Sequence, residues 1–72
     1  MSITSFDFGL WMKAKRRERG WSQKRLADKT FCHETSIGRW ERGEQYPTLD
    51  EAEQIARVLG AELVIREYGL DE

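Results

Sequence analysis

The chain has 72 residues and one cysteine, so it forms a single domain near the lower size limit for a self-sufficient hydrophobic core and has no intrachain disulfide. The net charge is only −1, but residues 1–42 hold ten Lys/Arg against five acids, a balance of +5, whereas residues 43–72 hold two against eight, a balance of −6. With one histidine, one cysteine and no phosphate-binding glycine loop, the sequence excludes the usual catalytic and metal-ligating sets, and we expect no enzymatic activity and no cofactor.

The first predicted helix begins after Asp7, a residue type that caps helix N-termini, and ends at Gly20. Phe8, Trp11 and Met12 lie on one face of this helix, together with the aliphatic stem of the lysine at position 15. We interpret this face, and all three tryptophans of the chain, as core.

The second predicted helix runs from Ser22 to Lys29, with Ser22 as its N-cap and with Leu26 and Ala27 facing inward. Its first turn carries Lys24 and the arginine at position 25, where the helix dipole disfavours cations by ~0.3–1 kcal/mol. A bound phosphate would reverse this penalty, so the turn is a candidate anion contact.

The third predicted helix runs from Glu34 to Arg42 and ends at Gly43, with Ile37 and Trp40 as its apolar stripe. The spacing of this helix from the second predicts a helix-turn-helix. The opposite, solvent-facing side of the third helix then comprises Glu34, Thr35, Gly38 and Arg39, and in helix-turn-helix proteins this side enters the major groove of DNA.

The fourth predicted helix starts at Thr48, which forms a capping box with Glu51, and ends at Gly60. Its core stripe comprises Leu49, Ala52, Ile55, Ala56 and Leu59.

The last segment, residues 61–68, is β-branched in its middle and alternates, and Gly69 interrupts it. A single strand cannot satisfy its own backbone groups, so we expect it to pair with the same strand of a second copy. The residues expected to make this dimer contact are Leu63, Val64, Ile65 and Arg66. The alternative is a tail that folds back on the fourth helix.

Taken together, these elements resemble the lambda-repressor-like helix-turn-helix family of Cro and phage repressors. The resemblance covers roughly residues 8–60 and rests on motifs at the family's spacings, namely Gly20-Trp21-Ser22-Gln23, Leu26-Ala27, the block 37–43, Pro47, Ile55-Ala56 and Leu59-Gly60. It implies a mainly α, four-helix DNA-binding domain over residues 1–60. The pattern of the tail adds a short C-terminal β-strand within residues 61–72, which we expect to be the dimerisation element.

The resemblance also implies roles for individual residues. Base edges would be contacted by Glu34, Thr35 and Arg39: Arg39 suits guanine, Glu34 suits the cytosine amino group, and Thr35 offers a hydroxyl and a methyl group. The residues expected to bind DNA phosphates, or to support that binding through their charge, are Gln23, Lys24, Arg25, Ser36, Arg42, Gln45 and Tyr46. Arg16 and Glu41 would form a structural ion pair.

The turn between the second and third helices departs from the family pattern, because Phe31 stands where a glycine with positive φ is common. The turn is therefore either strained or differently built. Cys32 falls at a position where a buried valine is expected, and His33 falls at the N-cap of the third helix; we interpret both as structural.

The sequence therefore predicts a sequence-specific double-stranded DNA-binding transcriptional regulator, either a dimeric repressor or an antitoxin-type autoregulator that also binds a toxin. The alternative is a protein-interaction module that uses the acidic half to hold a basic toxin or a component of the transcription machinery. No signal sequence or membrane-length apolar run is present, so we expect a cytoplasmic protein of bacterial or phage type without a membrane partner.

Overall fold

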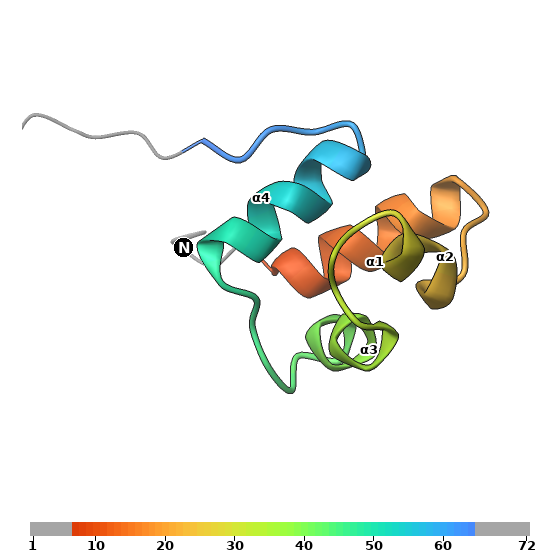
Figure 1. Cartoon of the computed structure of the whole chain (residues 1–72), viewed down its shortest axis with the longest axis horizontal. Helices are drawn as coiled ribbons and strands as arrows, with labels where there is room; N and C mark the ends of the chain where they lie inside the picture. Colours follow the sequence, from red (N-terminus) through yellow and green to blue (C-terminus); the bar gives the residue numbers. More distant parts are fainter. Residues whose placement is uncertain (1–6, 65–72) are drawn as a thin grey trace, which may run out of the picture.

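The computed structural model describes residues 7–64 and contains four helices in that range, α1 (Phe8–Glu18), α2 (Gln23–Asp28), α3 (Glu34–Glu41) and α4 (Leu49–Val58). α3 packs against both α1 and α2. α4 lies at the edge of the molecule opposite α3, with the end of the described chain running over it (Figure 1). The mainly α, four-helix prediction is confirmed. Within residues 7–64 no helix is long and apolar enough to cross a bilayer.

Three of the four helices begin with the side-chain caps that the sequence predicts. The Asp7 carboxylate accepts a hydrogen bond from the Leu10 amide at 3.0 Å, and the Ser22 hydroxyl accepts one from the Arg25 amide at 3.0 Å. Thr48 and Glu51 form both hydrogen bonds of a capping box. α3 differs, because His33 occupies its N-cap position but makes no side-chain cap hydrogen bond. Helix starts are thus set mainly by local side-chain chemistry.

The core cluster draws side chains from every helix. Met12, Leu26, Ile37 and Ile55 are fully buried, and the half-buried side chain of Cys32 packs against them. The predicted core face of the fourth helix needs one correction, since Leu49 is 63% exposed. As the first residue of α4, Leu49 lies outside the core cluster and lines a surface hollow with Asp50, Glu53 and Leu63.

The three tryptophans belong to the core or its edge. Trp40 is buried, whereas Trp11 and Trp21 are half-buried and pack against the cluster. The ring of Trp21 also has two cations close to it, with the Arg19 guanidinium carbon 5.4 Å and the Lys29 ammonium 4.8 Å from its centroid. Both distances lie within the range of cation–π contacts.

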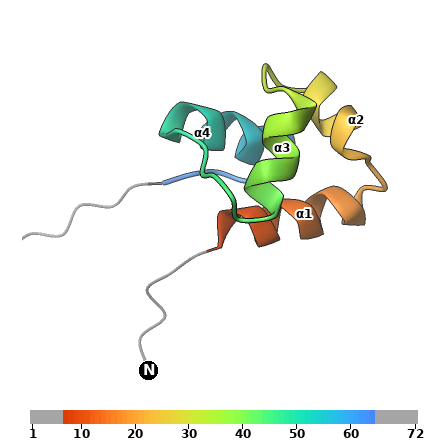
Figure 2. The same cartoon turned by 90° about the horizontal axis from the view of Figure 1, so that it is seen from below.

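Gly9 allows α1 and α3 to approach each other closely. A Cβ atom at this position would lie 2.0 Å from the carbonyl oxygen of Trp40, far inside van der Waals contact. Only a residue without a side chain therefore fits where the start of α1 crosses the end of α3 (Figure 2). The sequence analysis did not single out this glycine.

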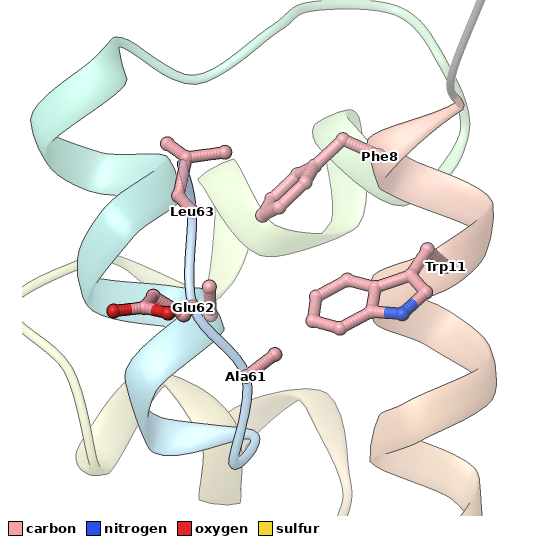
Figure 3. A pocket seen from close by; sticks show the side chains of 6 residues that line it. Phe8, Trp11, Ala61, Glu62 and Leu63 are labelled. Carbon is pink, nitrogen blue, oxygen red and sulfur yellow. The ribbon is translucent and has the colours of Figure 1, made fainter. Parts of the chain in front are cut away.

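The predicted C-terminal strand is absent from the part of its range that the structure describes. Residues 61–64 have no regular secondary structure, and residues 65–68, which include Ile65 and Arg66, lie outside the described residues. A strand is defined by its ladder to a neighbour, and the described part of this one chain supplies none. Instead, Ala61 and Leu63 turn back along α4 and face Phe8 and Trp11 of α1 across a hollow of about 210 Å³ (Figure 3).

Candidate nucleic-acid interface

The turn between α2 and α3 is built without a left-handed residue. Among residues 7–64, no residue other than glycine has a positive φ, so Phe31 is accommodated by a different turn and not by strain. The Phe31 amide donates to the Gln54 side-chain oxygen at 2.8 Å, and the Cys32 amide donates to the Thr30 hydroxyl at 3.1 Å. The Phe31 side chain itself is 94% exposed.

Gln54 was missed by the sequence analysis. It lies on α4 and caps the amide of a turn residue 23 positions earlier, and its side-chain oxygen is also 3.9 Å from the Cys32 sulfur. Burial raises the pKa of the Cys32 thiol, which favours the neutral form of this side chain. No local sequence signal marks such a contact, because it depends on how α4 packs.

A buried ion pair holds α3 against α1. Arg16 and Glu41 form two hydrogen bonds, Nε to Oε2 at 2.7 Å and Nη2 to Oε1 at 3.0 Å, and their side chains are only 9% and 2% exposed. The remaining Nη1 group of Arg16 donates to the Trp21 carbonyl at 2.7 Å. The hydrogen bond to Glu41 raises the pKa of Arg16, with a further coulombic contribution, against an opposing effect of burial. The pair thus fixes α3 relative to both α1 and the start of α2.

Gln23 extends this network to the first turn of α2. Its Nε2 atom donates to Glu41 Oε1 at 3.0 Å. Its side-chain oxygen lies 3.5 Å from where a Cβ atom of Gly38 would be. This position corrects the sequence interpretation of Gly38, which is not on the solvent face but buried beneath the Gln23 and Arg42 side chains.

The outer side of α3 presents polar side chains to solvent. Glu34, Thr35 and Arg39 are exposed, and Ser36 is half-buried. Thr35, Arg39 and Arg42 follow one another at helical spacing and form one stripe, which we call the α3 stripe. The three residues predicted to reach base edges are thus all exposed, but only Thr35 and Arg39 belong to the stripe, and Glu34 lies outside it.

The other predicted contact residues lie on α2, at the end of α3 and in the loop that follows it. On α2, Lys24 and Arg25 are exposed, and Lys24 makes an exposed ion pair with Asp28 at 3.5 Å. In the loop after α3, Gln45 and Tyr46 are exposed, Tyr46 by 82%. Arg42, at the end of the stripe, forms an ion pair with Glu44 at 2.7 Å.

α2 and α3 pack against each other about a short turn, α3 has a polar outer face, and α1 is joined to α3 by the buried Arg16–Glu41 pair. This arrangement defines a helix-turn-helix protein. The chain belongs to the helix-turn-helix family, because the family's model matches residues 12–65. The chain is also similar to the solved structure described as the master regulator for biofilm formation SinR in complex with DNA, with 28% sequence identity and a TM-score of 0.72. This similarity covers 76% of the present chain and 89% of the SinR chain. A search of curated proteins finds no match.

Proposed function

We propose that this protein is a sequence-specific double-stranded DNA-binding transcriptional regulator whose α3 stripe enters the major groove. The observation that carries the proposal is the exposed stripe on a helix that the buried Arg16–Glu41 pair holds rigidly against α1 and α2. Membership of the helix-turn-helix family and the likeness to a DNA-bound regulator support it. A rigidly held recognition helix retains its register on the bases.

In this proposal Arg39 reads a guanine through its guanidinium fork, with Glu34 and Thr35 contacting neighbouring bases. Lys24, Arg25, Ser36, Arg42, Gln45 and Tyr46 act on phosphates and set the register. Gln23 can bond Glu41 and a phosphate at the same time, because its side-chain amide nitrogen carries two hydrogens. One of them binds Glu41 at 3.0 Å, and the other is proposed to donate to a phosphate oxygen.

The test is a selection of bound sequences from random duplex DNA, followed by a salt titration on the selected site. We expect a defined site, and we expect log affinity to fall by ~0.9 for each phosphate neutralised per unit of log salt concentration. The charge division supports this, since residues 1–42 carry +5 although the whole chain carries −1. A flat titration, or no duplex binding at ~50 mM salt, would refute the proposal.

We further propose that residues 1–60 form the DNA-binding domain and that the segment from residue 61 onward makes a homodimer. One recognition helix contacts only a few base pairs, so two copies on half-sites about one helical turn apart would supply the specificity that a genome requires. Val64 is 60% exposed next to the hollow lined by Phe8, Trp11 and Leu63, which supports an apolar contact at this end of the chain. A dimeric repressor or an antitoxin-type autoregulator would both use such an arrangement.

Binding of another protein is the second candidate function. It is favoured by the hollow that Phe8, Trp11 and Leu63 line and by the acidic residues on α4. Asp50, Glu51 and Glu53 lie in the first half of α4, at the edge of the molecule opposite α3 (Figure 1). A basic partner, such as a toxin, could be held there without contact to the α3 stripe. Failure of DNA selection together with specific capture of a co-encoded basic protein would favour this function over DNA recognition.

A further inference from the structure

The backbone after α3 places Glu44 beside the α3 stripe. Gly43 has a φ of +77°, its amide donates to the Trp40 carbonyl at 3.1 Å, and the Glu44 amide donates to the Arg39 carbonyl at 2.9 Å. This pair of hydrogen bonds is the Schellman motif that ends many helices. It turns the chain back over the last turn of α3, so the position of Glu44 is determined by the helix end and not by a free loop.

The Glu44 carboxylate engages the guanidinium of Arg42 at two points. Nε of Arg42 donates to Oε2 at 2.7 Å, and Nη2 donates to Oε1 at 3.2 Å. The side chains of Arg42 and Glu44 are 57% and 54% exposed, so the pair lies in solvent and can be exchanged for another partner. Arg42 lowers the pKa of Glu44, first through the hydrogen bond and also through its charge, and Arg39 adds a smaller coulombic contribution in the same direction. The carboxylate therefore remains ionised at neutral pH and interacts with both arginines of the stripe.

A carboxylate and a phosphate present the same kind of acceptor to an arginine, namely two oxygens that accept parallel N–H groups. The Arg42 donors that hold Glu44 are thus the donors that a DNA phosphate would need. Glu44 also places a negative charge next to the duplex, where it repels the backbone.

We propose that Glu44 is a negative determinant of duplex binding, which competes with DNA phosphate for Arg42 and so weakens binding to every sequence alike. This inference rests on the proposed function. Its consequence is a lower affinity for every duplex, because an Arg42 that stays paired with Glu44 leaves the complex with one phosphate contact fewer. A site that also gains base contacts at Arg39 retains measurable affinity after this loss, whereas binding held only by phosphate contacts becomes weak, and the ratio of the two affinities is unchanged.

The test compares Glu44→Gln with Glu53→Gln in the full chain. The two variants change the net charge equally, and Glu53 also forms an exposed ion pair, with Arg57 at 3.4 Å, but lies on α4. Affinity for a short duplex of random sequence is measured by fluorescence anisotropy from ~50 to ~200 mM salt. Glu44→Gln should bind more tightly than the wild type and should steepen the salt dependence by ~0.9, the value for one added phosphate contact. Its gain in affinity should then be about 3.5-fold larger at ~50 mM than at ~200 mM salt.

The Arg42→Gln background provides the second measurement. If Glu44 acts through Arg42, adding Glu44→Gln to Arg42→Gln should leave the salt slope unchanged. Equal effects of Glu44→Gln and Glu53→Gln, or weaker binding by Glu44→Gln, would overturn the inference while leaving the proposed function intact. Absence of duplex binding by the wild type and by Glu44→Gln alike would overturn both.

Discussion

Replacing Glu41 with alanine tests whether the buried ion pair holds the helix-turn-helix together. The Arg16 side chain is only 9% exposed in the wild type, and the variant would leave its guanidinium with the Trp21 carbonyl, at 2.7 Å, as its remaining acceptor. The variant also removes the carboxylate oxygen that accepts the hydrogen bond from the Gln23 side-chain Nε2. Breaking a buried pair by removing one partner costs ~3–5 kcal/mol, because the other charge is left without compensation.

This cost is large relative to the stability of so small a domain. At ~0.05–0.15 kcal/mol per residue, a chain of 72 residues has a free energy of unfolding of about 4–11 kcal/mol. Glu41→Ala should therefore lower the melting temperature by roughly 12–40 °C, and a wild type at the low end of this range would yield a largely unfolded variant. Any loss of DNA binding in this variant would then report unfolding and not a lost contact.

The assay is urea denaturation followed by tryptophan fluorescence, with circular dichroism as a second probe. Asp28→Ala is the matched control, because it also removes the acid of an ion pair, but Lys24 and Asp28 are 70% and 60% exposed and the cost should stay below ~1 kcal/mol. In a double-mutant cycle, Arg16→Met with Glu41→Met should be far less destabilised than the sum of the two single variants. A Glu41→Ala variant within ~1 kcal/mol of the wild type, or an additive cycle, would refute the reasoning.

Three further outcomes follow from the proposed interface and the packing. Arg39→Ala should lose ~1–3 kcal/mol of binding free energy on the selected site and relax the preference at one base pair, whereas Lys24→Ala should weaken all sequences alike; an unchanged preference in Arg39→Ala would show that its assigned register is wrong. Gly9→Ala should destabilise the fold by ~1–3 kcal/mol, because its Cβ would meet the Trp40 carbonyl oxygen, and an unchanged melting temperature would contradict this contact. If the proposed strand pairing exists, Val64→Pro removes one of its ladder N–H groups and should give a monomer that binds a palindromic site weakly; a variant that sediments as a dimer of unchanged affinity would place the interface on the helices.

Sequence reasoning predicted best those features that depend on residues a few positions apart. The caps at Asp7, Ser22 and Thr48 and the helix ends before Gly20, Gly43 and Gly60 are all present as predicted. Each depends on a side chain bonding an amide three residues away, or on a glycine adopting a positive φ. The apolar spacing that buries Ile37 and Trp40 is equally local, because helical geometry alone places them on one side of α3.

The features that only the tertiary structure decided join residues far apart in the sequence. Gly9 is required by the Trp40 carbonyl, the Phe31 amide is satisfied by Gln54, and Gly38 lies beneath Gln23. These contacts depend on the angles at which separate helices cross, which propensity and spacing do not specify. Local sequence patterns determined four helices, three of them with side-chain caps, and a polar stripe, whereas packing decided which backbone atoms touch and which side chains remain available to a ligand.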